Sequence, residues 1–274
     1  MRSVETARLR MPALGLGTFR LEGREAERMT RCALAEGYRH IDTAQMYANE
    51  KAIGAGLRRA EVPRDAVFVT TKIWPDRFAP AEFARAVEES LQDLGTDYVD
   101  LLLLHWPSQA VPLADTLGAL ARAQERGQAR HVGVSNFTRA LYRQAEDLCP
   151  VPLAVDQLEY HPFLDQRPLR QFLAERDAVL TAYCPLALGA AVRDPVIREL
   201  ADAHGATAGQ VTLAWILAAG NTAAIPKTAN PERLGENLRA TELDLRADEI
   251  AAIDGLARPD GRIISPAGLA PDWD

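Results

Sequence analysis

The chain of 274 residues is long enough for one large domain, and its 47% hydrophobic content can fill a core. It carries 31 basic and 38 acidic residues, and this net charge of -7 argues against a broad contact with nucleic acid. The first twenty residues lack the apolar stretch of a signal peptide, and the apolar segment "VTLAWILAAGN" is interrupted by Thr212, Gly220 and Asn221. We therefore expect a cytoplasmic protein that contacts neither nucleic acid nor membrane.

The three cysteines, Cys32, Cys149 and Cys184, lie far apart and form no CxxC pair. An odd number at such spacing argues against a disulfide framework and against a zinc site. We expect no metal site, and the pattern is typical of a reducing compartment.

Short β-branched or leucine-rich runs alternate with amphipathic stretches, and no linker marks a domain boundary. In "AEFARAVEESLQDLG", for example, Phe83, Val87, Leu91 and Leu94 recur at helical spacing. Eight strands alternating with helices predict one (β/α)8 barrel domain over residues 1–274. The expected strands are residues 13–18, 38–42, 66–72, 98–105, 130–136, 153–157, 178–183 and 222–227.

An open doubly wound sheet is the structural alternative for such an alternation. The first strand–helix junction, "GLGTFRLEG", does not complete the glycine-rich dinucleotide fingerprint that this alternative would place there. The barrel is therefore favoured.

Polar side chains stand at or just after the ends of all eight expected strands. Because the carboxyl ends of parallel barrel strands meet at one face, where barrel enzymes keep their chemistry, we expect these side chains to gather there. A single polar residue after a strand is often a helix cap, but eight in succession indicate a site. They are Thr18, Asp42, Lys72, His105, Ser135 with Asn136, Gln157, Tyr183 and Lys227.

Asp42, Lys72 and Tyr47 together suggest a proton relay. Lysine is mostly exposed in proteins, so Lys72 alone could be a surface residue, but Asp42 ends the adjacent strand and could offset its desolvation. A phenol is a poor acid at neutral pH, and a nearby ammonium stabilises its phenolate and lowers its pKa. We expect Asp42 to hold Lys72, and Lys72 to tune Tyr47.

His105 and two tryptophans follow the same strand ends. On its own, His105 could equally be a buried core histidine, but beside Lys72 it becomes a candidate donor to a substrate oxygen. Trp74 and Trp106 lie just beyond the ends of two strands, and they suit either ordinary packing or the apolar walls of a pocket. We interpret them as walls.

A second charged cluster follows the last expected strand. Lys227, the hydroxyl of Thr228 and Arg233 lie near a helix start and form a candidate anion site in an acidic protein. The alternative reading of "PERLGENL" is a solvated helix with Pro231 in its first turn.

With these residues identified, the chain resembles the aldo-keto reductase superfamily from "MPALGLGTFR" to "IPKTANPERLGEN". The segments "YRHIDTAQMYANE", "TKIW", "YVDLLLLHWP" and "VGVSNF" occur in the family's order and at compatible separations. The resemblance implies that Asp42, Tyr47, Lys72 and His105 are catalytic, with Tyr47 as general acid and His105 orienting a carbonyl group.

The resemblance also implies reduction of aldehydes and ketones by NADPH, bound without a Rossmann domain. Lys227 and Arg233 match contacts with the 2′-phosphate, Glu236 and Asn237 match positions near the adenine, and Tyr183 matches a ring that stacks on the nicotinamide. Phe19 joins Trp74 and Trp106 in the expected substrate pocket. The complete set of expected cofactor contacts is Thr18, Ser135, Asn136, Gln157, Tyr183, Pro185, Leu186, Lys227, Thr228, Arg233, Glu236 and Asn237.

Within the family, "MPALGLGTFRL", "TAQMY" and the ending "RIISPAGLAPDWD" look like the bacterial 2,5-diketo-D-gluconate reductase B branch, which also resembles methylglyoxal reductases. This implies small, polar substrates such as α-dicarbonyls or keto-sugar acids, and we expect a monomeric or weakly associating protein. Two features depart from the family. Cys184 replaces the usual serine in "YCPL", and the short charged segment before Met11 leaves open the hairpin that usually closes the barrel's bottom.

Two other functions are compatible with parts of this pattern. Lys72 could form a Schiff base in a barrel aldolase, although an ion pair with Asp42 would keep it protonated and poorly nucleophilic. The chain could also be a non-catalytic NADP(H)-binding regulatory module, although the complete set of four candidate catalytic residues argues for an enzyme.

Overall fold

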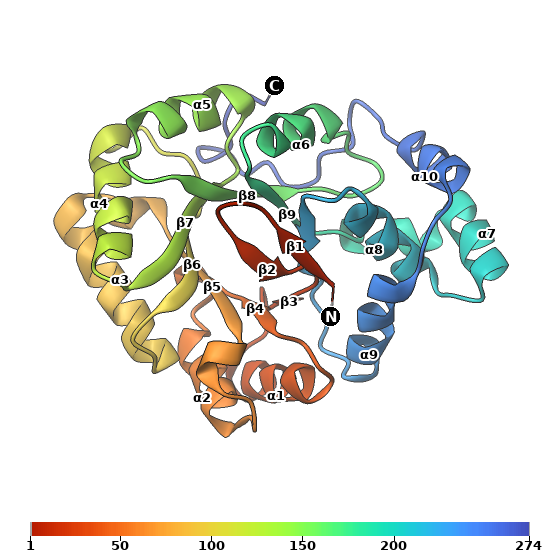
Figure 1. Cartoon of the computed structure of the whole chain (residues 1–274), viewed down its shortest axis with the longest axis horizontal. Helices are drawn as coiled ribbons and strands as arrows, with labels where there is room; N and C mark the ends of the chain where they lie inside the picture. The colour runs from red at the N-terminus through yellow and green to blue at the C-terminus, as the bar shows by residue number, and fades with distance from the viewer. Residues whose placement is uncertain (1, 274) are drawn as a thin grey trace.

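Eight parallel strands form the central sheet of the computed structural model, which describes residues 2–273. Each strand pairs with the next one along the chain, and Leu14 bridges Ala224 in parallel, so that the first and last strands close the sheet into a barrel (Figure 1). The (β/α)8 prediction is confirmed. The strands are β3 (Leu16–Gly17), β4 (His40–Asp42), β5 (Phe68–Ile73), β6 (Val99–Leu104), β7 (Ala129–Ser135), β8 (Leu153–Glu159), β9 (Val179–Tyr183) and β10 (Thr222–Ala224).

The helices surround the barrel on its outer side (Figure 1). Predicted helical spacing is visible in α3, which buries Phe83, Val87 and Leu94 and ends where Gly95 adopts a left-handed conformation with φ of 66°. The α-helices are α1 (Gly23–Ala35), α2 (Glu50–Arg59), α3 (Pro80–Leu94), α4 (Leu113–Glu125), α5 (Arg139–Leu148), α6 (Arg167–Ala174), α7 (Pro195–His204), α8 (Ala208–Ala218), α9 (Glu232–Arg239) and α10 (Ala247–Asp254).

Burial explains the most apolar sequence segments. Every residue of β5 and β6 is buried, because helices cover their outer face and side chains fill the barrel. Helix α8, the apolar segment noted above, is buried from Gly209 to Leu217. Among residues 2–273, no helix is both long and apolar enough to span a bilayer.

Several expected strands are shorter than predicted, and the first shortens most, from residues 13–18 to Leu16–Gly17. β4 begins at His40 rather than Tyr38, and β10 ends at Ala224 rather than Lys227. Pro226 has no N–H group and cannot continue the ladder as a donor, although its carbonyl still accepts a hydrogen bond from Gly17 N at 3.1 Å. Lys227 therefore lies beyond the strand.

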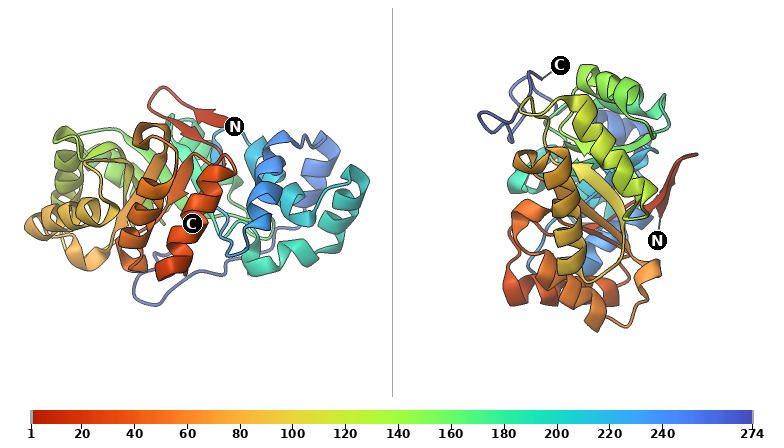
Figure 2. Two further views of the ribbon diagram at one scale, coloured as in Figure 1. Left: turned by 90° about the horizontal axis from the view of Figure 1, so that it is seen from below. Right: turned by 90° about the vertical axis from the view of Figure 1, so that its left-hand side faces the viewer.

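A hairpin of β1 (Ser3–Glu5) and β2 (Arg10–Pro12) crosses one opening of the barrel (Figure 1). It buries Val4, Leu9 and Met11, and Arg8 donates to the carbonyl of Leu153 at the start of β8. The sequence did not decide whether this hairpin forms. The structure shows that it is present and covers the amino ends of the strands. The tail after α10 lies on the opposite side of the barrel (Figure 2), which is the side of the carboxyl ends.

Gly17 allows the closest backbone approach at the barrel seam, and we predict that Gly17→Ala destabilises the fold. A Cβ atom there would lie 2.5 Å from the carbonyl oxygen of Ile225, which is backbone and cannot rotate away. The expected loss is roughly 1–3 kcal/mol in the free energy of unfolding, measured by urea denaturation.

Gly118→Ala is the matched control, because Gly118 lies inside α4 and the nearest atom to its added Cβ is the flexible end of Arg122 at 3.4 Å. It should stabilise the protein by up to about 1 kcal/mol. An equal effect of the two substitutions would show that the seam is not tightly packed.

Candidate active site

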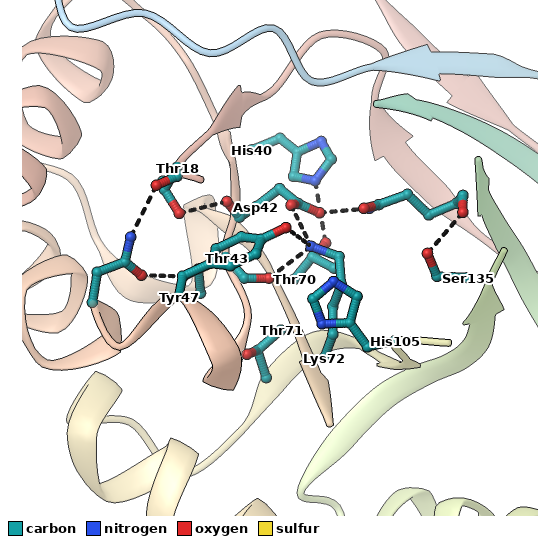
Figure 3. Close-up of polar contacts among 12 residues, drawn as sticks. Thr18, His40, Asp42, Thr43, Tyr47, Thr70, Thr71, Lys72, His105 and Ser135 are labelled. Atoms are coloured by element: carbon teal, nitrogen blue, oxygen red, sulfur yellow. Dashed lines mark hydrogen bonds and ion pairs between the residues drawn. The ribbon is translucent and has the colours of Figure 1, made fainter. Parts of the chain in front are cut away.

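Four side chains meet at the carboxyl ends of three neighbouring strands (Figure 3). Asp42 is the last residue of β4, Lys72 is the last but one of β5, and His105 directly follows β6. Tyr47 lies in the 3-10 turn Gln45–Tyr47 that follows β4. Because β4, β5 and β6 pair in this order, the barrel itself brings the four groups together.

The ammonium of Lys72 is completely buried and surrounded by oxygen atoms. Its Nζ donates to Oδ1 of Asp42 at 2.6 Å and to the carbonyl of Thr43 at 2.8 Å. Burial alone would lower the pKa of Lys72, but Asp42 and Tyr47 outweigh it and raise the pKa above its ordinary value. Lys72 is therefore a charged ammonium at neutral pH, with Asp42 offsetting its desolvation.

Asp42 is held on every side. Its Oδ2 accepts a hydrogen bond from Nε2 of Gln157 at 2.6 Å, and its backbone carbonyl accepts from N and Oγ1 of Thr18 at 3.0 and 2.9 Å. Both carboxylate oxygens thus have partners, which is what a buried charge requires. The expected cofactor contact Thr18 is completely buried and is a backbone partner of Asp42 in this structure.

The phenol of Tyr47 points toward the Lys72 ammonium, and Nζ donates to its Oη at 3.4 Å. Burial raises the pKa of Tyr47 above 10.0, and the charge of Lys72 acts in the opposite direction without cancelling that rise. Lys72 favours the phenolate, as expected, but the expectation that it brings the pKa below the ordinary value is wrong, because burial is the larger effect. Tyr47 keeps its proton at neutral pH.

His105 is 6% exposed and lies beside Tyr47, with 5.7 Å between the ring centroids. Burial lowers the pKa of His105 well below 6.5, and the charge of Lys72 lowers it further. The imidazole is therefore neutral at pH 7 and can donate one N–H group. Its ring also makes an edge contact with Trp74, at 5.0 Å between centroids.

Four of the expected cofactor contacts form one chain of hydrogen bonds beside these four groups. Tyr183 Oη donates to Oδ1 of Asn136 at 2.7 Å, and Nδ2 of Asn136 donates to the carbonyl of His105 and to Oγ of Ser135, both at 3.0 Å. Ser135 in turn donates to the carbonyl of Gln157 at 2.8 Å. The structure thus places Ser135, Asn136, Gln157 and Tyr183 at adjacent strand ends.

The expected phosphate contacts lie between β10 and α9. Lys227 and Arg233 are both exposed, and within residues 2–273 neither forms an ion pair with a carboxylate. Thr228 Oγ1 accepts from Asn230 N at 3.0 Å, and Asn230 Oδ1 accepts from Glu232 N at 3.1 Å at the start of α9. Two exposed cations beside a helix start have the chemistry to bind a phosphate group.

The expected adenine contacts are engaged within the fold. Oε1 of Glu236 accepts from Oγ1 of Thr207 at 2.7 Å, at the cap of α8. Asn237 is buried, and the phenol of Tyr38 donates to the carbonyl of Leu234 in the same helix at 3.1 Å. These two hydrogen bonds hold α9 against its neighbours, and the contact of Glu236 and Asn237 with adenine stays a prediction.

The loop after β9 carries the two remaining expected cofactor contacts. Pro185 is buried and Leu186 packs against the core. Cys184, which replaces the family's serine, adopts a left-handed conformation with φ of 51°. Burial raises the pKa of Cys184 to about 11, so its thiol stays protonated at neutral pH.

Two of the three aromatic residues expected to line a substrate pocket lie beside Tyr47 and His105. Phe19 is 45% exposed, and its ring centroid lies 5.1 Å from that of Tyr47. Trp106 is almost covered and contacts Trp273 of the tail, with centroids 6.4 Å apart. Phe19 thus lies beside Tyr47 and Trp74 beside His105, whereas the contact of Trp106 is with the tail.

The tail is fastened by a residue that sequence reasoning missed. Glu159, the last residue of β8, is fully buried, and its carboxylate accepts from the backbone N–H groups of Ile263 and Ile264 at 2.7 and 2.8 Å. Arg262, next to this anchor, places its guanidinium carbon 3.5 Å from the ring centroid of Trp273. The sequence does contain a signal for this residue. Residues two apart in a strand point to the same face, so extending the predicted strand from Gln157 to Glu159 places both side chains on one face.

A nicotinamide cofactor fits this set of donors. The exposed cations of Lys227 and Arg233, without an ion pair in the described part of the chain, suit a phosphate, and the ring of Tyr183 is partly exposed. The comparisons with known proteins agree. The model of the family described as "Aldo/keto reductase family" matches residues 13–258.

Several relatives match over almost their whole length. Methylglyoxal reductase DkgB of Escherichia coli O157:H7 is 41% identical over 267 residues, covering 96% of this chain and 99% of the relative. A crystal structure described as a putative 2,5-diketo-D-gluconic acid reductase B has a TM-score of 0.95 and 44% identity, covering 96% of this chain and 94% of that one.

A more distant structure carries a cofactor. It is a Bombyx mori aldo-keto reductase in complex with NADP, with a TM-score of 0.89 and 28% identity, covering 93% of this chain and 92% of that one. Together with the geometry of the site, these matches show that the chain belongs to the aldo/keto reductase family and is an oxidoreductase with a nicotinamide-cofactor site.

Proposed function

We propose that the protein uses NADPH to reduce small aldehydes and ketones to alcohols, with Tyr47 as the proton donor. The observation that carries the proposal is the connected set Asp42, Lys72 and Tyr47 beside a neutral His105, enclosed at the mouth of the barrel. When bound, NADPH supplies the hydride that the carbonyl carbon receives.

The protein's part is to bind the carbonyl oxygen and to protonate it. Oη of Tyr47 and an N–H group of His105 are neutral donors that can both point at the oxygen, where negative charge develops. An alkoxide is a far stronger base than a phenolate, so Tyr47 can protonate it even with a raised pKa. The fixed charge of Lys72 stabilises the phenolate that remains.

The substrate that we propose is a small α-dicarbonyl such as methylglyoxal or a keto-sugar acid such as 2,5-diketo-D-gluconate. The support comes from the names of two relatives, a methylglyoxal reductase and a 2,5-diketo-D-gluconic acid reductase B, and from the aromatic walls Phe19 and Trp74. The four reacting groups come from one chain, so a monomer suffices.

A Schiff-base aldolase is disfavoured by the state of Lys72. Its raised pKa and its 2.6 Å contact with Asp42 keep it protonated, and a protonated amine is not a nucleophile. A regulatory module without catalysis would have no need to hold Tyr47, Lys72 and His105 in contact.

Tyr47→Phe tests the proton donor. The substitution removes one oxygen atom, and we expect kcat for methylglyoxal reduction to fall roughly 10²- to 10⁴-fold while the Kd for NADPH, measured by fluorescence, stays unchanged.

Tyr98→Phe is the control for this substitution, because the Tyr98 hydroxyl makes no hydrogen bond within residues 2–273 and its ring lies between Arg64 and Arg130, away from the site. It should leave both values unchanged. Near-normal turnover by Tyr47→Phe would refute the role of Tyr47.

Lys227→Met and Arg233→Met test the choice of cofactor. If both cations bind the 2′-phosphate, each substitution should raise the Kd for NADPH about 10- to 100-fold and leave the weaker binding of NADH unchanged.

Arg239→Met is the matched control, because Arg239 is also exposed on α9 but lies in its last turn. It should affect neither cofactor. Equal losses for NADPH and NADH in the Lys227 and Arg233 variants would contradict phosphate binding.

A further inference from the structure

Glu50 is a buried carboxylate behind the site that the proposed chemistry does not use. It is the first residue of α2, three positions after Tyr47, and it is 5% exposed. Its Oε1 accepts from Oγ1 of Thr71 at 2.5 Å and its Oε2 accepts from Oγ of Ser90 at 3.1 Å. Because Thr71 belongs to β5 and Ser90 to α3, one carboxylate joins the first turn of α2 to a strand and to a second helix.

Thr71 directly precedes Lys72 in β5. Adjacent residues of a strand point to opposite faces, so Thr71 meets Glu50 on the outer face of β5 while Lys72 meets Tyr47 on the inner face. The segment 47–50 is thus attached to both faces of one strand. The Lys72–Tyr47 contact is long for a hydrogen bond at 3.4 Å, so this contact alone holds the phenol only weakly.

Asn49 fastens the same segment elsewhere. Its Nδ2 donates to the carbonyls of Thr18 and Leu21, both at 2.9 Å, and its Oδ1 accepts from Oγ1 of Thr43 at 2.7 Å. These contacts lead to β3, β4 and their loops. Glu50 therefore supplies the side-chain hydrogen bond between this segment and the outer face of β5, the strand that carries Lys72.

The backbone between Tyr47 and Asn49 also needs support. Ala48 adopts a left-handed conformation with φ of 52°, which costs free energy for a residue with a Cβ atom. A segment with this strain keeps its shape because its neighbours hold it.

We propose that Glu50 is a positioning residue that holds Tyr47 at the distance from Lys72 and His105 needed for proton transfer. The inference rests on the proposed role of Tyr47 as proton donor. A carboxylate suits the place, because it accepts from two hydroxyl groups at once and charge-assisted hydrogen bonds are about twice as strong as neutral ones.

Glu50 also differs from the central groups in its titration. Burial raises the pKa of Glu50 to about 7, against the hydrogen bonds from Thr71 and Ser90. The other charges that act on it are Asp93 of α3, which raises its pKa, and Lys72 of β5, which lowers it.

A change of turnover centred near pH 7 therefore reports on Glu50, because Tyr47 and Lys72 titrate far above that pH and His105 far below it. Protonation of Glu50 removes the charge from both hydrogen bonds. Tyr47 is then held less firmly, so kcat falls as the pH is lowered through about 7.

Glu50→Ala and Glu50→Gln test the inference with methylglyoxal as substrate. Glu50→Ala removes the link, and we expect kcat to fall about 10- to 100-fold with an unchanged Kd for NADPH. Glu50→Gln keeps the shape but stays neutral, so it should match the wild type near pH 6 and fall behind it near pH 8. Its own kcat should not change with pH through about 7.

Two further variants separate positioning from general stability. Thr71→Val removes the partner hydroxyl from the outer face of β5 and should reproduce part of the loss in kcat. Asp100→Asn removes an equally buried carboxylate, which pairs with Arg64 and Arg130 at 3.0 and 3.1 Å near the start of β6. It should lower the melting temperature and leave kcat unchanged.

A double variant gives the sharpest result. If Glu50 acts through the phenol, Glu50→Ala should cause no further loss in the Tyr47→Phe background. A full additional loss in that background, a wild-type kcat in Glu50→Ala, or an equal loss in Asp100→Asn would overturn the inference.

Hydrogen exchange separates this inference from the proposed function. The amides of Tyr47 and Ala48 donate to the carbonyls of Ala44 and Gln45 at 3.0 and 3.1 Å, and they should exchange faster in Glu50→Ala but not in Asp100→Asn. Absence of NADPH-dependent reduction in the wild type would refute the proposed function alone. Unchanged exchange of these amides would refute positioning by Glu50.

Discussion

The buried ion pair between Lys72 and Asp42 is the interaction on which the site depends. Two charges that are 0% and 1% exposed are stable only when each finds partners for all its polar atoms. The barrel provides these partners, because β4 and β5 pair in parallel with Asp42 opposite Thr70, and Lys72 lies two residues further on the same face. A shift of one residue in this register would send Lys72 out of the barrel.

One ammonium has opposite consequences for its two neighbours. It opposes the effect of burial on Tyr47, and it adds to the effect of burial on His105. The result is a protonated phenol and a neutral imidazole around the same space, with a permanent positive charge behind them. Such an arrangement is prepared for negative charge on an oxygen atom before any substrate enters, and this preorganisation is the main contribution of protein dipoles and charges to catalysis.

Much of this arrangement follows from local sequence patterns. The apolar runs that end in Asp42, Lys72 and His105 predict both the strands and the face on which their last side chains meet, because parallel barrel strands all finish at one end. The sequence predicts α3 in the same way, because Phe83, Val87 and Leu94 recur at helical spacing and are buried on one face of that helix.

Other features depend on contacts that local patterns do not contain. The raised pKa of Tyr47 results from the packing of its surroundings, and Glu50 meets Thr71 and Ser90 across 21 and 40 residues of sequence. Glu236 is predicted to contact the cofactor, and in the fold it also joins α9 to Thr207, 29 residues earlier in the sequence. Burial and long-range hydrogen bonding decide such roles, and both appear only once the chain is folded.

The tail is attached to Glu159 mainly through its backbone, which has a consequence for the side chains of the tail. Glu159 holds the tail through the backbone N–H groups of Ile263 and Ile264, and the side chain of Ile263 is 39% exposed. The guanidinium of Arg262 adds a side-chain contact to the same carboxylate at 3.9 Å, but the two backbone hydrogen bonds place no demand on the side chains of Ile263 and Ile264. These two side chains can therefore change while the backbone of the tail keeps its path.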